Sequence, residues 1–308
     1  MSFEPAYLRL HESGELARRA EQARAMLAEC AICPRQCRVN RLEDEIGFCG
    51  AGRQALVGSA GPHFGEERPL VGSGGSGTVF FAGCNLGCVF CQNSELSHER
   101  AGRQVSAGEL ANIMLGLQRR GCHNINFVTP THVVPQILEA LGPAIEGGLV
   151  VPLVYNCGGY EAMPTLRLLD GVIDIYMPDA KYASGEVAER LCAAPDYPQR
   201  MREALTEMHR QVGDLELDER GLATRGLLVR HLVLPGGCAG TPEIMAFLAS
   251  LSRDTYVNVM AQYRPLYRAG EFPPLDRHLT GAEYREAVRE ALDAGLRRLD
   301  ERPLRGLL

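Results

Sequence analysis

Short apolar runs that alternate with helical stretches constrain the fold of this chain most strongly. Each run is apolar throughout and does not alternate in polarity, as expected for strands buried on both faces. The six runs are 78–81, 125–128, 149–155, 172–177, 227–234 and 255–260. Successive β–α units predict a parallel sheet with right-handed crossovers. A closed barrel of eight units needs more chain, so we expect an α/β fold built as a partial (β/α)6 TIM-like barrel.

Sequence patterns outside the barrel predict three further segments. Residues 1–60 contain an amphipathic helix at 13–29 and then a Cys-rich segment, which we expect to bind metal. A Gly-rich stretch, 61–77, lacks the Gly-Lys-Ser/Thr of a phosphate-binding loop and is expected to be a flexible connector or lid. The barrel takes 78–265. A C-terminal extension, 266–308, includes a helix over 281–300.

Charge and composition narrow the classes of function. The net charge of −6 argues against a general nucleic-acid partner. Apolar stretches of bilayer length are absent, and acidic residues interrupt the N-terminus, so we expect neither a membrane span nor a signal peptide. A cytoplasmic location follows as an expectation. Eleven cysteines in a reducing compartment favour metal binding over disulfides.

The most specific motif is a loop with three cysteines directly after the first predicted strand. Its spacing is Cys84-x3-Cys88-x2-Cys91. Three thiolates in one loop suit a [4Fe-4S] cluster and leave its fourth iron without a protein ligand. An open iron binds a substrate or cofactor directly, which points to catalysis. A structural zinc site needs four protein ligands in a closed site.

A second set of four cysteines precedes the barrel. Its spacing, Cys30-x2-Cys33-x3-Cys37-x11-Cys49, suits either a tetrahedral zinc site or an auxiliary iron–sulfur cluster. Zinc would staple the fold, whereas a cluster would relay electrons. Four unrelated thiols are the simplest alternative. The other cysteines, Cys122, Cys157, Cys192 and Cys238, are expected to be small buried apolar side chains.

Polar side chains follow the predicted strands, where parallel α/β folds collect their chemistry. They are Thr129, Thr131, Asn156, Asp179, Lys181 and Gln262. Lys181 stands out because the chain has 31 arginines and this single lysine. A guanidinium does not replace a compact ammonium at a tight site, so we expect a functional role for Lys181.

At these motifs the chain resembles the radical S-adenosylmethionine (AdoMet) superfamily. The three-cysteine loop with Phe90 before its last cysteine is that superfamily's signature. Within it, the chain most resembles the activating enzymes of glycyl-radical enzymes, such as the pyruvate formate-lyase activator. Four segments carry this closer resemblance, and they begin at Asn156 (Asn-Cys-Gly-Gly-Tyr), Asp179 (Asp-Ala-Lys), Arg230 (Arg-His-Leu-Val-Leu-Pro-Gly) and Val259 (Val-Met-Ala-Gln-Tyr).

The chain departs from the resemblance at two strand ends. Most superfamily members carry Gly-Gly-Glu after the second strand to hold the amino group of AdoMet, whereas this chain has Thr129-Pro130-Thr131-His132. Threonine hydroxyls and backbone carbonyls accept the same N–H bonds. Gln262 replaces a histidine of the activators.

The resemblance implies an oxidoreductase that cleaves AdoMet reductively at the [4Fe-4S] cluster. The resulting 5′-deoxyadenosyl radical would abstract hydrogen from a peptide or protein substrate. Lys181, Asp179 and Arg230 are implied as catalytic residues, and Thr129, Thr131, Asn156, Asp179, Lys181 and Gln262 as cofactor-binding residues. A one-electron donor of the flavodoxin or ferredoxin type is the implied partner. The alternative is a non-catalytic iron–sulfur electron carrier or sensor.

Overall fold

The computed structural model describes residues 3–300 and is organised around one ten-stranded sheet. The strand order is β10-β9-β8-β6-β5-β4-β2-β1-β3, and β7 pairs with β8. All neighbours from β2 to β10 are parallel. These parallel strands are β2 (Ser76–Phe81), β4 (Ile125–Val128), β5 (Leu153–Cys157), β6 (Ile175–Pro178), β8 (Ala223–Leu232), β9 (Tyr256–Met260) and β10 (Arg298–Leu299). The six predicted strands are confirmed, and so is the partial barrel.

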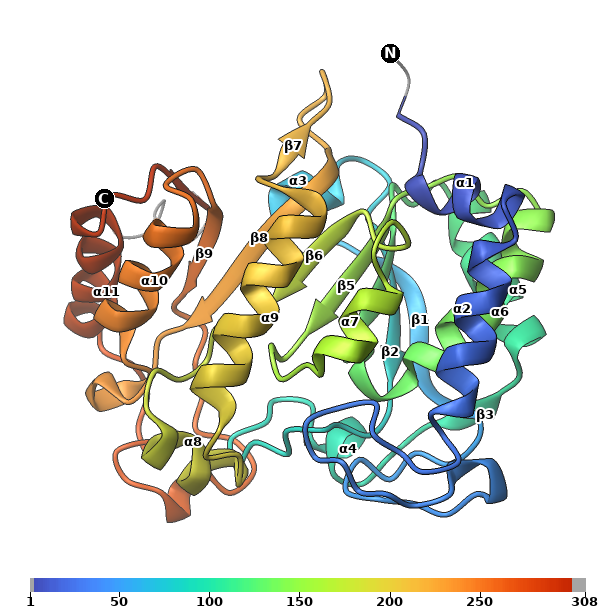
Figure 1. Cartoon of the computed structure of the whole chain (residues 1–308). Coiled ribbons are helices and arrows are strands. Elements are labelled where there is room, and N and C mark those ends of the chain that lie inside the picture. Colours follow the sequence, from blue (N-terminus) through green and yellow to red (C-terminus); the bar gives the residue numbers. More distant parts are fainter. Residues whose placement is uncertain (1–2, 301–308) are drawn as a thin grey trace.

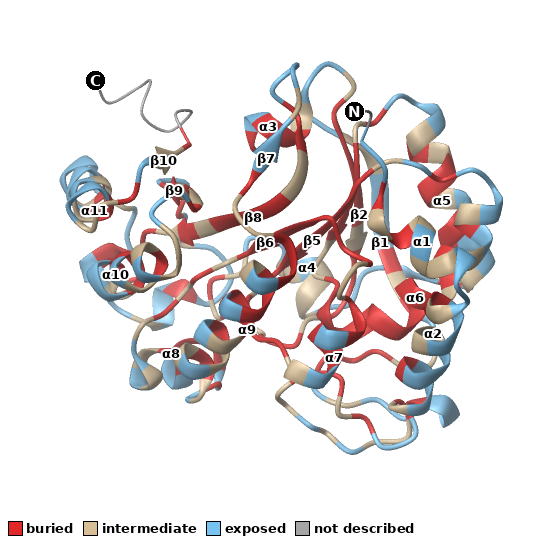
Figure 2. Cartoon of the chain, turned by 45° about the horizontal axis from the view of Figure 1, so that its top comes forward, coloured by how far each residue is buried: buried red, intermediate tan, exposed pale blue. Residues whose placement is uncertain are grey.

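Helices cover the outer face of this curved sheet (Figure 1). The main crossover helices are α5 (Ala107–Arg119), α6 (Val134–Glu146), α7 (Met163–Leu168), α8 (Gly185–Cys192), α9 (Tyr197–Val212) and α10 (Thr241–Leu251). Helices α8 and α9 are separate, because Ala193 takes a left-handed backbone conformation between them. The central strands β2, β4, β5 and β6 are almost entirely buried, while the helices bury mainly their inward faces (Figure 2).

The N-terminal extension packs beside the first half of the barrel. Helices α1 (Ala6–Glu12) and α2 (Glu15–Ala25) precede the Cys-rich segment, and α2 lies against α6 (Figure 1). Helix α2 confirms the predicted N-terminal helix, with shorter bounds. At the other end of the chain, α11 (Gly281–Asp293) begins with a capping box, in which Thr280 and Glu283 satisfy each other's backbone N–H groups. The helix predicted over 281–300 ends earlier, at Asp293, and β10 follows it.

The Gly-rich stretch differs from the expected flexible connector. Its first residues end β1 (Ala55–His63), which pairs antiparallel with β2 and with β3 (Arg103–Val105). Its middle forms the one-turn helix α3 (Arg68–Val71), and its last residues begin β2. The apolar periodicity of a strand is hard to see in Ala-Leu-Val-Gly-Ser-Ala-Gly-Pro-His, because its second half contains small and polar residues.

Helix α3 plugs the barrel at the amino ends of its strands. Leu70 is fully buried among inward-facing side chains, which include Val154 of β5, Ile175 of β6 and Leu228 of β8. Burying a leucine side chain contributes about 1.5–3 kcal/mol to folding. The interior of the barrel is therefore filled at this end.

Candidate active site

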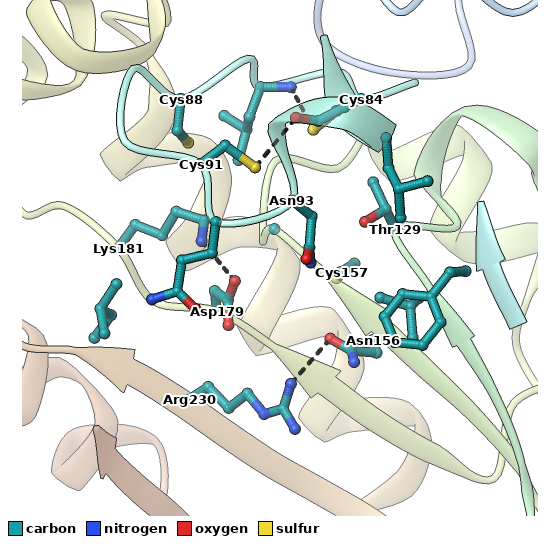
Figure 3. A pocket seen from close by; sticks show the side chains of 18 of the residues that line it. Cys84, Cys88, Cys91, Asn93, Thr129, Asn156, Cys157, Asp179, Lys181 and Arg230 are labelled. Atoms are coloured by element: carbon teal, nitrogen blue, oxygen red, sulfur yellow. Dashed lines mark hydrogen bonds and ion pairs between the residues drawn. The ribbon is translucent and has the colours of Figure 1, made fainter. Parts of the chain in front are cut away.

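A cavity of about 390 Å³ occupies the barrel above this plug. That volume is within the range that holds a cofactor or a drug-sized ligand. The three-cysteine loop forms one end of the cavity, and Arg230 and Asn156 lie at the other, with Asp179 and Lys181 between them (Figure 3). Its lining includes nine of the predicted residues of this site, namely Cys84, Cys88, Cys91, Thr129, Asn156, Asp179, Lys181, Arg230 and Gln262.

The three-cysteine loop turns sharply between β2 and α4 (Ser94–Ser97), and glycines make this turn possible. Gly83 has φ +85, and a Cβ there would collide with the backbone oxygen of Cys49. Gly87 has φ +65, and a Cβ there would lie only 3.1 Å from the ring of Phe48. Both positions therefore favour glycine, since other side chains rarely adopt these backbone angles.

Each thiol of this loop has a hydrogen-bond donor. The Leu86 N–H donates to Cys84 Sγ (3.3 Å), the Ser97 hydroxyl to Cys91 Sγ (3.1 Å) and the Tyr182 hydroxyl to Cys88 Sγ (3.7 Å). Such bonds favour the thiolate, which is the form that binds metal. Each thiol of the loop therefore has a partner that stabilises its metal-binding form.

The pKa values of these thiols differ. The neighbouring Cys192 thiol and the charge of Lys181 lower the pKa of Cys88 below its ordinary value despite its burial. Burial raises the pKa of Cys84 to about 12 and also raises that of Cys91. Cys88 is thus the thiol that is ionised most readily, and the charge of the lysine contributes to that ionisation.

Lys181 and Asp179 form an ion pair in the middle of the cavity. The Lys181 Nζ donates to Asp179 Oδ2 at 2.6 Å. Burial alone would lower the pKa of Lys181, but the negative charges of Asp179 and Cys88 raise it above its ordinary value. The ammonium therefore stays protonated, and it faces both the carboxylate and the thiol end of the cavity.

Arg230 is held by two carboxylates that the sequence analysis did not single out. Its guanidinium bonds to both oxygens of Glu67, to Glu66, and more weakly to Asn156 Oδ1 at 3.5 Å. Glu67 also accepts from Asn258 Nδ2 of β9 (2.7 Å). Although burial would raise it, the pKa of Glu67 is lowered by the charge of Arg230. Most of the bonding capacity of Arg230 is thus used inside the protein.

Glu66 and Glu67 lie in the segment between β1 and α3, which crosses the open side of the partial barrel to reach β8 and β9. Glu66 also shares a hydrogen bond with His63 (2.9 Å), and both side chains line the cavity. An adjacent pair of carboxylates in a Gly-rich stretch was the signal in the sequence. Asn93, just after the three-cysteine loop, also lines the cavity and was not predicted.

The two threonines after β4 have different positions. Thr129 lines the cavity and has φ +59, an unusual backbone conformation for a β-branched residue. Thr131, predicted as a cofactor-binding residue, does not line the cavity. Its side chain is fully buried, and its hydroxyl donates to the buried carboxylate of Glu161 at 2.7 Å. The chain turns into a short 3-10 helix (Thr131–Val133) after Pro130, and this turn directs the second threonine inward.

The four-cysteine set forms a separate pocket beside the three-cysteine loop. Cys30, Cys33, Cys37 and Cys49 all line a small cavity of about 10 Å³. Burial raises the pKa values of Cys33 and Cys49. Among residues 3–300, no three or more His, Cys, Asp or Glu side chains converge closely enough to hold a single metal ion, and this applies to both cysteine sets.

Helices that could cross a membrane are not found in the described part of the chain. Comparison with protein-family models gives no match. A solved structure of anSMEcpe, an anaerobic sulfatase-maturating enzyme with bound AdoMet and Cp18Cys peptide, is similar with a TM-score of 0.48 and 9% identity. The match covers 71% of this chain and only 60% of that protein's chain.

A sequence relative is much more similar. Uncharacterized protein MJ0674 of Methanocaldococcus jannaschii is 33% identical over 281 residues, which cover 88% of this chain and 76% of the relative. An alignment of this length spans the Cys-rich extension or the C-terminal region in addition to the barrel, because the barrel alone is shorter. This chain therefore belongs to the same protein family as MJ0674.

Proposed function

We propose that this protein is a radical AdoMet enzyme that acts on a peptide or protein substrate. In this reaction one electron and AdoMet give methionine and a 5′-deoxyadenosyl radical, which takes a hydrogen atom from the substrate to form 5′-deoxyadenosine. When bound at Cys84, Cys88 and Cys91, a [4Fe-4S] cluster supplies the electron transfer. The electron itself comes from a donor of the flavodoxin or ferredoxin type.

One observation carries the proposal. Three thiols, each with a hydrogen-bond donor, form one end of the cavity above α3. Polar side chains in or directly after β4, β5, β6 and β8 line the rest of it. The incomplete set of ligands leaves room for a cofactor beside the thiols. An electron carrier has no need of such a cavity, so the catalytic interpretation is favoured over the carrier.

The residues of the cavity have separable roles in this proposal. Lys181 places a positive charge near the thiolates, and Asp179 orients that ammonium while keeping a second oxygen for N–H or O–H groups of the cofactor. Thr129, Asn156 and Gln262 provide hydrogen-bonding groups around the same space. Arg230 acts as a positioning residue, because Glu66 and Glu67 occupy its guanidinium and it in turn contacts Asn156.

The carboxylate that most radical AdoMet proteins place after the second strand has a substitute in this proposal. Glu66 lines the cavity and enters it from the segment before α3. It is 5% exposed and bonded to both His63 and Arg230. A carboxylate reaching the cavity from another element would accept the N–H bonds of a cofactor amino group.

The test is an anaerobic assay with reconstituted protein, dithionite and AdoMet. We expect release of 5′-deoxyadenosine by the wild-type protein and its loss in Cys88→Ala. Cys238→Ser is the matched control, since Cys238 lies outside the cavity lining. A protein that holds iron at this loop but releases no 5′-deoxyadenosine would instead be an electron carrier.

A second measurement addresses the substrate. Peptides deuterated at Cα are added, and 5′-deoxyadenosine is analysed by mass spectrometry. Incorporation of deuterium would support hydrogen abstraction from a peptide. Cleavage of AdoMet with no deuterium transfer from any peptide or from a co-purified protein would rule out this substrate class and leave the AdoMet chemistry intact.

A further inference from the structure

Two sulfurs of the four-cysteine pocket have an N–H donor close by. The backbone N–H of Phe48 donates to Cys37 Sγ (3.4 Å), and Arg41 Nη1 lies 3.9 Å from Cys30 Sγ. The backbone N–H groups of Arg35 and Ala51 also favour the thiolate forms of Cys33 and Cys49. Hydrogen bonds to sulfur are a means by which proteins stabilise metal thiolates.

A buried cation faces the same pocket. Arg41 is 1% exposed, and among residues 3–300 no carboxylate pairs with it. Its Nε and Nη1 donate to backbone oxygens of Gly52 and His132, but its Nη2 has no partner. A buried guanidinium without a counter-charge is costly. Four thiolates around a metal carry a net negative charge, which would be the counter-charge of Arg41.

His132 adds a donor atom that is also unsatisfied. Its side chain is buried and lines the pocket, and its Nε2 bonds to the backbone oxygen of Ala82 at 2.9 Å. Since Nε2 must donate in that bond, Nδ1 carries a lone pair, and it has no partner. A histidine fixed through one nitrogen by a carbonyl, with the other nitrogen bare, is the arrangement found around protein-bound metals.

Arg35 connects this pocket to the three-cysteine loop. It lies between Cys33 and Cys37 in the sequence, and its guanidinium donates to the backbone oxygens of Asn85 (2.9 Å) and Leu86 (3.2 Å). It also bonds to the backbone oxygens of Cys192 (2.6 Å) and Ala193. The ring of Phe48, the neighbour of Cys49, stacks on this guanidinium at 3.9 Å.

Both the backbone of Arg35 and its stacking partner are therefore fixed by residues of the four-cysteine set. The carbonyls that Arg35 binds belong to the loop between Cys84 and Cys88, and to the end of α8, where Cys192 contacts Cys88. The Arg35 guanidinium is thus a direct link between the two cysteine sets.

We propose that Cys30, Cys33, Cys37 and Cys49 bind a second metal centre, charge-balanced by Arg41, and that this centre holds the three-cysteine loop in shape through Arg35. Zinc and an iron–sulfur cluster share the four-thiolate chemistry. The four thiols must draw closer together to hold a single zinc ion, because they do not converge closely enough for one in this structure. Ordering of the extension on metal binding is expected, because metal affinity in such segments is coupled to folding.

The first experiment measures metal in a full-length variant that lacks the loop ligands. Cys84→Ala/Cys88→Ala/Cys91→Ala protein is purified anaerobically, and iron, sulfide and zinc are determined per chain. We expect it to retain either about one zinc or about four irons with sulfide. The visible absorption of iron thiolates distinguishes the two. Adding Cys33→Ser and Cys49→Ser to this variant should remove the metal.

Equal metal contents in these two variants would overturn the proposal. If the multiple variants do not fold, the wild-type protein decides the matter. After reconstitution it should hold metal beyond one four-iron cluster, either as zinc or as additional iron. A total of one four-iron cluster without zinc would contradict a second centre. Neither measurement depends on AdoMet cleavage, so the outcome is independent of the proposed function.

The second experiment tests the coupling through Arg35. Iron release from the three-cysteine loop to a chelator is followed in Arg35→Lys, with Arg38→Lys as the matched control. Arg38 lies in the same segment, but its side chain is about half exposed and bonds only to Glu29 and Gln36. We expect release at least about tenfold faster in Arg35→Lys and no change in the control.

Cys33→Ser/Cys49→Ser should show the same acceleration, because Arg35 loses its anchor when the second centre is lost. Iron release at the wild-type rate in this double variant would refute the coupling, even if the four cysteines bind metal.

Discussion

Lys181 donates a 2.6 Å hydrogen bond to Asp179, and the two side chains are 17% and 22% exposed. They follow β6 in the sequence and point into the cavity between the three thiols and Arg230 (Figure 3). The only lysine of the chain is thus a cavity residue, placed where its charge lowers the pKa of Cys88. This relationship is the basis of the first prediction.

Lys181→Ala should slow AdoMet cleavage while leaving the iron content unchanged. The loss of a preorganised charge typically reduces the rate by about 100-fold or more. Lys181→Arg should be almost as slow, because the planar guanidinium does not fit the position of the ammonium. The measurements are the rate of 5′-deoxyadenosine formation and iron per chain. Turnover at the wild-type rate in the alanine variant would refute the role assigned to Lys181.

Thr129 and Thr131 should respond differently to substitution. Thr129→Gly relieves about 1 kcal/mol of strain from the left-handed backbone conformation. Glycine also makes the unfolded chain more flexible, which offsets this gain, so the free energy of unfolding should change little. It should weaken AdoMet binding, because the hydroxyl lines the cavity. Thr131→Val should instead lower the free energy of unfolding by about 1–3 kcal/mol, because Glu161 loses a buried donor. Denaturant unfolding and equilibrium binding of AdoMet check both. Weakened binding in Thr131→Val with unchanged stability would reverse these assignments.

Glu161 should make stability depend on pH. Burial raises its pKa to about 7, although Thr131 and Tyr155 donate to it. In the folded state it therefore keeps its proton at pH values where the unfolded chain has lost it. The contribution of Glu161 to the free energy of unfolding is complete below about pH 4.5. It falls, by an amount on the order of a few kcal/mol, as the pH rises to about 7.

This dependence is measured as a difference between the wild-type protein and Glu161→Gln. The free energy of unfolding of the wild type, relative to the variant, should decrease between these two pH values and then level off. A relative stability that increases over the same range would mean that Glu161 is ionised in the folded protein.

Glu67→Gln should destabilise the fold by about 3–5 kcal/mol, because it removes one partner of a buried ion pair and leaves Arg230 undercompensated. Glu66 still compensates part of the charge of Arg230, so we expect a loss of stability at the lower end of this range. The exposed pair of Glu4 and Arg9 provides the control, and Glu4→Gln should change stability by less than about 1 kcal/mol. Urea unfolding measures both. Similar effects of the two substitutions would show that Glu67 does not compensate Arg230 in solution.

Much of the fold follows from local patterns. The six apolar runs become the parallel strands of the barrel, since a segment that is apolar on both sides must be covered on both faces. The spacing of Cys84, Cys88 and Cys91 placed three ligands in one loop, and strand-end positions placed Thr129, Asn156, Asp179 and Lys181 around one cavity. These features depend on neighbours in the sequence or on the rule that parallel strands end at the same edge.

Only the tertiary structure decided the contacts between distant segments. Glu66 and Glu67 reach Arg230 from more than 160 positions away, and Arg35 reaches Leu86 and Cys192 from outside the barrel. Thr131 turns inward because a 3-10 helix follows Pro130 and a buried carboxylate accepts its hydroxyl. Hydrogen-bond partners of this kind are chosen by packing in three dimensions, where chain separation carries no information, whereas strand burial and ligand spacing are properties of short stretches of sequence.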